Sequence, residues 1–171
     1  MPDNTKILVR NARDQDIPAV VEIDTEAFAA YGTAEQPETF LLRLRAFPDG
    51  FIILVAENEV AGFACSEKWL TAREPGLDEN PLVTHQTDGR VLCITSMAVK
   101  GKFQGRGYGM RILDKLIDIA HRERCQQIVL ETTHAQGLFL KRGFTTVQNR
   151  TERGISLDVM ALDVESHYKS S

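Results

Sequence analysis

A short glycine-rich turn between an apolar strand and an amphipathic helix is the feature that most constrains how this chain can fold. Residues 90–99 (RVLCITSMAV) predict a central strand that is apolar on both faces, and residues 110–123 predict a helix with one apolar stripe. Residues 104–109 (QGRGYG) lie between them. Glycines permit the tight backbone curl that points amide N–H groups and a helix N-terminus at one anion. The sequence therefore predicts an α/β domain with an anion site at this junction.

The charge around this turn is opposite in sign to the charge of the whole chain. Residues 100–115 contain five Lys or Arg and one Asp, whereas the formal net charge of the chain is -4. A local basic patch favours a small phosphorylated ligand. An acidic protein lacks the basic surface that nucleic-acid phosphates require, so we expect no nucleic-acid partner.

Two common phosphate-binding motifs fit the turn poorly. A dinucleotide-binding fold places GxGxxG directly after its first strand, with a ribose-binding acid about 20 residues later. Here the glycines come late in the chain, after a charged loop, and the third glycine is in the wrong position. A P-loop requires Gly-Lys-Ser/Thr, which does not follow. A plain glycine-rich turn with a solvated basic face is the remaining alternative to a phosphate site.

The rest of the pattern predicts a single mixed α/β domain. A chain of 171 residues suits one core, so we assign residues 1–171 to one domain with an ordered core over residues 7–164. Residues 70–89 predict a loop insertion with at most one short element, and residues 165–171 predict a frayed tail. Hairpins together with strand–helix–strand crossovers predict a mixed sheet. The other expected elements are strands over 7–13, 51–57, 60–69, 127–131, 145–149 and 155–164 and helices over 17–28, 36–46 and 134–142.

The cysteines and the apolar runs argue against a metal-binding, secreted or membrane-spanning protein. Cys65, Cys93 and Cys125 are odd in number and show no metal-ligand spacing, so we expect buried free thiols and no metal site. Free thiols favour a reducing, cytoplasmic setting. The densest apolar run, residues 51–56, is too short to span a bilayer, and residues 1–6 show no signal peptide. We expect no membrane partner.

Residues in and after the glycine turn resemble one enzyme family. Gln104, Gly107 and Gly109 match the Q/R-x-x-G-x-G/A signature of the GNAT superfamily of N-acetyltransferases, and residues 138–144 (LFLKRGF) are similar to its Y-x-K-x-G-F helix end. The similarity extends over residues 7–162, with residues 70–89 as an extra loop. It implies a mixed α/β fold of the GNAT-like acyl-CoA N-acyltransferase type. The central sheet of that fold is splayed between its fourth and fifth strands and has helices on both faces.

The resemblance implies acetyl-CoA as the cosubstrate. Its diphosphate would lie on the amides of the glycine turn, and its pantetheine arm would pair with Met97 and Val99. An amide near Met97 or Ala98 would polarise the acetyl carbonyl. The implied cofactor-binding residues are Met97, Ala98, Val99, Gln104, Gly105, Arg106, Gly107, Tyr108, Gly109, Met110, Phe139 and Arg142.

The resemblance also implies acetyl transfer to a primary amine by direct attack in a ternary complex, but one residue departs from the family pattern. Phe139 stands where many relatives carry a tyrosine that protonates the departing thiolate, and a phenyl ring has no proton to give. Transfer further requires a group that takes a proton from the amine. Candidates for these catalytic roles are Glu67, Ser96, Glu131 and His134, with Thr132 and Thr133 as further proton donors. For Glu67, Glu131 and His134 a purely structural or solvated role is the alternative.

Recognition of the acceptor depends on the first helix and on the loop insertion. Asp24 falls within the apolar stripe of the first helix, so it is either buried with partners or lines a cleft. The expected substrate-binding residues are Asp24, Phe28, Tyr31 and Glu67. If the loop covers the acceptor site, its acids Glu74, Asp78, Glu79 and Asp88 would favour a cationic substrate. A solvated surface insertion or a homodimer contact is the alternative role of the loop.

Three functions stay open on the sequence alone. A small-molecule amine is slightly favoured as the acceptor, because the long loop would narrow the groove that a peptide needs. Acetylation of a protein N-terminus or a lysine is the first alternative. A non-catalytic acyl-CoA-binding or sensing domain is the second, because of Phe139.

Overall fold

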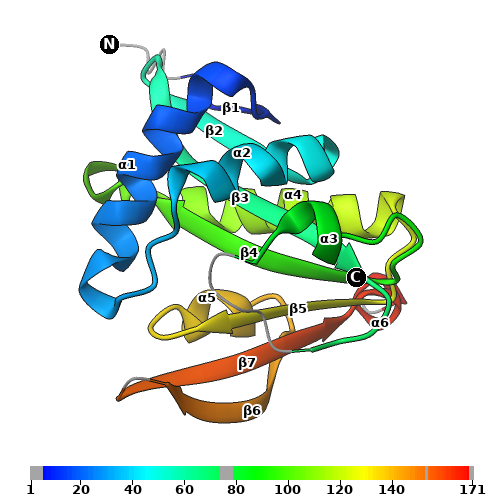
Figure 1. Ribbon diagram of the computed structural model, residues 1–171. Helices are drawn as coiled ribbons and strands as arrows, with labels where there is room; N and C mark the ends of the chain where they lie inside the picture. The colour runs from blue at the N-terminus through cyan, green and yellow to red at the C-terminus, as the bar shows by residue number, and fades with distance from the viewer. Residues whose placement is uncertain (1–5, 74–78, 153, 170–171) are drawn as a thin grey trace.

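A seven-stranded mixed sheet forms the centre of the protein (Figure 1). The computed structural model describes residues 6–73, 79–152 and 154–169. The strands are β1 (Leu8–Asn11), β2 (Ile52–Ala56), β3 (Glu59–Trp69), β4 (Val91–Val99), β5 (Gln127–Thr132), β6 (Thr145–Glu152) and β7 (Ile155–Asp163). Their order in the sheet is β1-β2-β3-β4-β5-β7-β6, in which β4 and β5 are parallel and the other neighbours antiparallel.

Helices cover both faces of this sheet (Figure 1). The α-helices are α1 (Ile17–Phe28), α2 (Pro37–Ala46), α3 (Pro81–Thr84), α4 (Tyr108–Arg122), α5 (Gln136–Leu140) and α6 (Val164–Lys169). Short 3-10 turns are η1 (Asp14–Asp16), η2 (Ala29–Tyr31), η3 (Pro48–Gly50) and η4 (Gly101–Phe103). The mixed fold with helices on two faces, predicted from the sequence, is confirmed.

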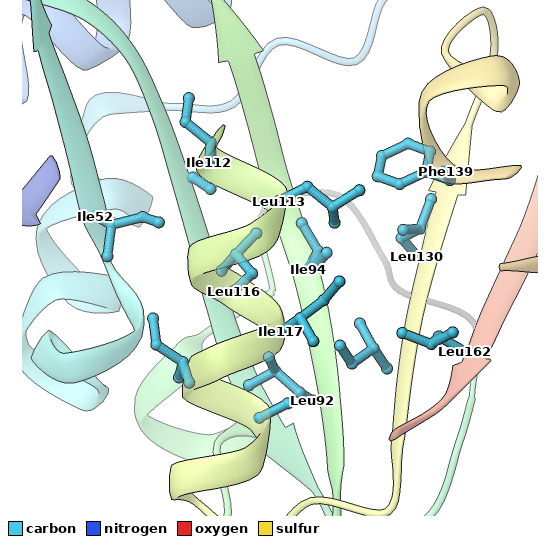
Figure 2. Close-up of a cluster of buried hydrophobic side chains, with 14 of the residues drawn as sticks. Ile52, Leu92, Ile94, Ile112, Leu113, Leu116, Ile117, Leu130, Phe139 and Leu162 are labelled. Carbon is cyan, nitrogen blue, oxygen red and sulfur yellow. The ribbon is translucent and has the colours of Figure 1, made fainter. Parts of the chain in front are cut away.

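The two largest apolar clusters lie on opposite faces of the sheet, each between the strands and a layer of helices. On one face, α1 and α2 bury Val20, Ile23 and Phe40 against the strands. On the other face, α4 turns one apolar stripe toward β4, β5 and their neighbours (Figure 2). The stripe recurs every three to four residues, so a single side of the helix is buried. Its members are Ile112, Leu113, Leu116, Ile117 and Ala120.

The sheet is splayed between β4 and β5, as the resemblance implied. The two strands pair over three residues each, Val91 to Cys93 with Gln127 to Val129. β4 then continues to Val99 and β5 to Thr132 without pairing to each other. The two halves of the sheet therefore diverge toward the end where α5 lies (Figure 1).

A β-bulge interrupts β4 just beyond this point. The register with β3 shifts between Cys65 and Ser66, so that Ser66 pairs with Ile94 and Cys65 with Ser96. Thr95 is the extra residue, and its hydroxyl donates to the carbonyl of Cys65 at 3.1 Å. Bulges of this kind change the direction in which the following side chains point.

Two segments differ from the sequence expectation. The prediction of a frayed tail over residues 165–171 is wrong for its described part, because α6 forms there and packs on the sheet through Val164, which is 2% exposed. The N–H of Val164 also donates to the carbonyl of Gln126 at 3.0 Å. Within residues 70–89, the short helix α3 forms, and the side chain of Asn80 caps it by accepting from the N–H of Leu82.

Within the described residues, no helix combines the length and apolarity that a membrane crossing requires. The three cysteines are buried and free, as the sequence predicted. Burial raises the pKa of Cys65 and of Cys125 to about 11 and raises the pKa of Cys93 well above its ordinary value. Since the thiolate is the reactive form, all three thiols are protected at neutral pH.

We expect the folded protein to react with a disulfide reagent such as DTNB at a small fraction of the rate of the unfolded chain. The increase in absorbance after mixing at neutral pH measures the rate of reaction. In denaturant all three thiols should react. Rapid stoichiometric labelling of the folded protein would contradict the burial described here.

Candidate active site

One cavity of about 580 Å³ occupies the gap between β4 and β5. Four parts of the chain line it: the segment after α1, the unpaired stretch of β4, the glycine turn with the start of α4, and the end of β5 with α5. Side chains of the β6–β7 hairpin complete one wall. The splay therefore creates a continuous space that reaches residues on both faces of the sheet.

The glycine turn presents an open backbone at the N-terminus of α4. Gly105 and Gly107 adopt φ values of +80° and +82°, which side chains rarely tolerate. Apart from the adjoining residues of the turn, no heavy atom of the described chain lies within 4 Å of a Cβ built at either glycine, and both glycines line the cavity. Phe103 and Tyr108 are buried on either side and anchor the turn. The turn could hold an anion such as a diphosphate, because the N-terminus of α4 contributes free amides and positive potential there.

The free edge of β4 offers peptide groups to a ligand. The N–H of Lys100 donates to the carbonyl of Ala61 on β3 at 2.8 Å. Because successive peptide groups alternate along a strand, those of Met97 and Val99 point away from β3 and toward the gap. The side chain of Gln104 donates to the carbonyl of Val99 at 3.1 Å, which shows that this edge accepts hydrogen bonds.

Two aromatic rings meet across one side of the cavity. Tyr31, in η2, stacks on His134, between β5 and α5, with ring centroids 5.4 Å apart and an interplanar angle of 14°. Both residues line the cavity, as does Phe28. Nδ1 of His134 lies 2.8 Å from the hydroxyl of Thr133. The contact narrows the space between the α1–α2 segment and the β5–α5 turn.

An ion pair forms part of the opposite wall. Glu131 of β5 receives two hydrogen bonds from Arg150 of β6, from Nε and Nη2 at 2.9 Å each. Both residues line the cavity. The two-pronged geometry holds the carboxylate in one orientation beside the apolar side chains of Ile155 and Leu157.

A buried polar network lies behind the α1 side of the cavity. Asp24 is 1% exposed and accepts the N–H of Glu35 at 2.9 Å and the hydroxyl of Ser96 at 3.0 Å. Arg43 of α2 is paired with Glu35 and donates to the sulfur of Cys65 at 3.3 Å. Burial on its own would lower the pKa of Arg43, but Cys65 and Glu35 raise it above its ordinary value, so the guanidinium stays charged.

Most of the residues predicted from the sequence meet in this cavity. Its lining includes Phe28, Tyr31, Ser96, Met97, Ala98, Val99, Gln104, Gly105, Gly107, Tyr108, Gly109, Met110, Glu131, Thr132, Thr133, His134 and Phe139. Asp24 does not line it but contacts it through Ser96. Arg106 and Arg142 lie outside, because Arg106 pairs with Glu57 at 3.4 Å and Arg142 binds Asp114 through two hydrogen bonds of 2.7 and 3.1 Å.

Glu67 also lies outside the cavity. Its carboxylate is buried and accepts hydrogen bonds from Nε1 of Trp69 at 2.6 Å and from the hydroxyl of Thr84 at 2.9 Å. Glu67 pairs with Cys93 at the joined end of β4 and β5, away from the splay. We therefore assign it a structural role, as an anchor of α3, and remove it from the catalytic and substrate-binding candidates.

The loop insertion packs near Glu67 and not over the cavity, as far as the structure describes it. Glu74 and Asp78 lie outside the described residues. Glu79 pairs with Arg73 at 2.8 Å, and no described residue of 70–73 or 79–89, including Asp88, lines the cavity. His85 accepts the N–H of Lys68 at 3.0 Å, and burial, followed by the charge of Lys68, lowers the pKa of this histidine.

Several lining residues were not predicted from the sequence. Glu35 has no local signal, since its position at the cavity depends on tertiary contacts with Arg43 and Asp24. Arg150, Ile155 and Leu157 belong to the last hairpin, where alternation of side chains could have indicated one shared face. No group of three or more His, Cys, Asp or Glu side chains in the described part of the chain is arranged to hold a metal ion.

Sequence and structure comparisons identify this arrangement. The sequence profile of the Acetyltransferase (GNAT) family matches residues 17–144, and the chain belongs to this family. No curated protein matches the sequence significantly.

Solved structures share the fold at low sequence identity. The loading GNATL domain of CurA from Lyngbya majuscula is 14% identical over 94% of this chain and 99% of that chain, with a TM-score of 0.81. YncA from Salmonella typhimurium, solved with its cofactor acetyl-CoA, is 21% identical over 92% and 94%, with a TM-score of 0.70. The ribosomal-protein-S18-alanine N-acetyltransferase from Escherichia coli is 20% identical over 93% and 94%, with a TM-score of 0.67.

We predict that Glu67→Ala lowers the free energy of unfolding by about 1–3 kcal/mol, because the buried Nε1–H of Trp69 loses its acceptor and Thr84 loses one of its two acceptors. Urea unfolding followed by the fluorescence of Trp69, the single tryptophan of the chain, measures the loss. Glu38→Ala on the exposed surface of α2 is the matched control. An unchanged free energy of unfolding in Glu67→Ala would remove its structural role.

Proposed function

We propose that this protein is an acetyl-CoA-dependent N-acetyltransferase that transfers the acetyl group to a primary amine by direct attack in a ternary complex. The observation that carries the proposal is the single cavity that joins three features. These are an open glycine turn at the N-terminus of α4, the free edge of β4, and a polar wall with proton-accepting groups. Membership of the acetyltransferase family supports the reaction class.

Acetyl-CoA would supply a thioester carbonyl to the reaction, and the chain would hold it at three places. The amides from Gly105 to Gly109 bind the diphosphate, with the N-terminus of α4 adding positive potential. Met97 and Val99 pair with the extended arm through their outward peptide groups. An N–H of the same β4 edge then orients and polarises the carbonyl, since a preorganised donor stabilises the charge that develops there.

For the acceptor, we favour a small primary amine. The stacked rings of Tyr31 and His134 narrow the cavity on the side that the α1–α2 segment lines. A folded protein could present only a flexible chain end to such a space. Acetylation of a protein N-terminus or lysine is the second candidate, because a fold neighbour is an N-acetyltransferase of a ribosomal protein.

Phe139 decides how the thiolate departs. Its ring is 5% exposed, lines the cavity, and packs on Phe144 with centroids 5.5 Å apart and planes at 61°. The ring excludes water but donates no proton. Thiols ionise near neutral pH, so the thiolate is a tolerable leaving group, and the hydroxyls of Thr132 and Thr133 together with His134 are the nearest candidates to donate a proton.

Release of free thiol distinguishes an enzyme from an acyl-CoA sensor. The purified protein is mixed with acetyl-CoA and a panel of small amines, amino acids and short peptides, and thiol is followed with DTNB. We expect steady thiol release with at least one amine and a much lower rate without amine. Binding of CoA, measured by calorimetry, without thiol release from any amine would favour the sensor, and absence of binding would overturn the assignment of the cavity.

We predict that Gly107→Leu weakens CoA binding at least about tenfold, roughly 1.4 kcal/mol, because the side chain fills the open turn. Gly154→Leu is the matched control, since Gly154 also has open surroundings and a φ of +77° but lies in the β6–β7 turn. Both variants should lose about 1–2 kcal/mol of stability through backbone strain. Equal CoA affinity of the two variants in calorimetry would contradict the glycine-turn site.

We predict that Phe139→Tyr leaves CoA affinity unchanged and leaves kcat equal or higher, because the added hydroxyl can protonate the departing thiolate. Steady-state kinetics with the best amine of the panel test this. A collapse of kcat with intact CoA binding would mean that the added oxygen occupies space that the acceptor needs.

A further inference from the structure

The bulge in β4 turns one polar side chain toward α1. Residues two apart share a face in a regular strand, yet Ile94 belongs to the core beneath α4 and Ala98 to the core beneath α1. The alternation therefore reverses at Thr95, the extra residue of the bulge. Ser96, which follows it, points to the α1 face and contacts Asp24. Without the bulge, this hydroxyl would face the apolar core of α4.

The hydrogen bond to Asp24 determines whether the hydroxyl of Ser96 donates or accepts a hydrogen bond toward a ligand. Ser96 lines the cavity, and its hydroxyl donates to Oδ1 of Asp24 at 3.0 Å. An ionised carboxylate only accepts hydrogen bonds, so the proton of the hydroxyl is directed to Asp24. The oxygen of Ser96 is then left to accept a hydrogen bond from the cavity. A group that carries N–H, such as an amine, is the complementary partner.

Asp24 has a separate structural contact. Its Oδ2 accepts the N–H of Glu35 at 2.9 Å and so holds the segment that leads into α2. This contact explains why α1 carries a buried carboxylate, but it does not require Ser96. The bond from Ser96 to Oδ1 gives the same carboxylate a second role, because the hydroxyl group of Ser96 connects the carboxylate to the cavity.

The other ionisable groups around Asp24 and the cavity are engaged differently. Glu35 is paired with Arg43, which also donates to Cys65, and both oxygens of Glu131 accept from Arg150. His134 is stacked on Tyr31 and lies beside the hydroxyl of Thr133. Asp24 differs from them because it does not line the cavity and is connected to it by the hydroxyl of Ser96.

We propose that Ser96 and Asp24 form a proton relay that activates the acceptor amine, an inference that rests on the proposed acetyltransferase function. The amine enters as an ammonium. One of its protons moves to the oxygen of Ser96 while the hydroxyl proton of Ser96 moves to Oδ1 of Asp24, leaving a neutral amine and a protonated carboxyl group. Ser96 touches the substrate and is catalytic, whereas Asp24 acts through it and is a positioning residue.

The remaining steps balance without another reactant. The lone pair of the neutral amine forms the C–N bond with the thioester carbonyl carbon, and the C–S bond breaks with its electron pair on sulfur. The nitrogen releases its next proton, which balances the charge of the thiolate. Asp24 then returns its proton to solvent through Ser96, which restores the starting state.

The test compares kcat/KM across pH for Ser96→Ala, Asp24→Asn and the double variant. At neutral pH, each single variant should lose about 10²-fold. The double variant should lose no more than either single variant, because the two residues act in series. Without the relay, the rate should rise about tenfold per pH unit toward the pKa of the amine, since only the neutral amine reacts. The wild-type profile should be flatter over the same range.

Three controls separate this relay from a structural effect. Thr25→Ala, on the exposed side of α1, should keep the wild-type profile. Ser96→Thr retains a hydroxyl and should restore most of the activity lost in Ser96→Ala. CoA affinity and melting temperature should stay near wild-type values in Ser96→Ala. The pH profile of this variant then tests the relay even if Asp24→Asn does not fold.

Three results would overturn the relay. A wild-type pH profile and wild-type kcat/KM in Ser96→Ala would remove the relay and leave the proposed acetyltransferase intact. A loss of activity in Ser96→Ala that is equal at all pH values would mean a packing role. If the wild-type protein transfers acetyl to no amine, the proposed function fails and the relay fails with it.

Discussion

The parting of β4 from β5 after three paired residues is the constraint on which the rest of the structure depends. Beyond that point, β4 carries outward peptide groups that no strand of the described chain satisfies, and unpaired polar backbone is costly when it is buried. The side chain of Gln104 meets part of this need at Val99. A ligand with amide groups of its own can form hydrogen bonds with the remaining peptide groups. The break in the sheet therefore lowers the stability of the fold locally and also creates a binding surface.

Packing on the two faces keeps this gap from closing. The stripe of α4 fills the space behind the strands, and Phe139 extends that core to α5 (Figure 2). The ring of Phe139 packs in turn on that of Phe144. On the other face, the pair of Glu35 and Arg43 is almost completely buried, and loss of either partner would leave an uncompensated charge that costs about 3–5 kcal/mol. One wall of the cavity is thus held by apolar contacts and the other by a charged network that has little freedom to rearrange.

Local signals predicted the glycine turn, the amphipathic helix α4, the β2–β3 hairpin and the succession of helices and strands along the chain, because each is encoded by periodicity or by turn residues close in sequence. The same signals could not predict α6, since its polar sequence becomes a helix only through the burial of Val164. Ionic partners of Arg106 and Arg142 were equally hidden, because Glu57 and Asp114 are distant in the chain. The case of Glu67 is different: antiparallel pairing places the end of β3 beside the start of β4, so the sequence order already implied that this residue lies at the joined end of the sheet.

The contacts at that joined end also bear on the size of the cavity. The N–H of Gln126 donates to the carbonyl of Arg90 at 2.7 Å, and the N–H of Val164 donates to the carbonyl of Gln126 at 3.0 Å. These bonds connect the first residue of α6 to the joined ends of β4 and β5, from which the two half-sheets diverge. A displacement of α6 would therefore act where the two half-sheets join, and a change of the angle between them would alter the width of the cavity near His134.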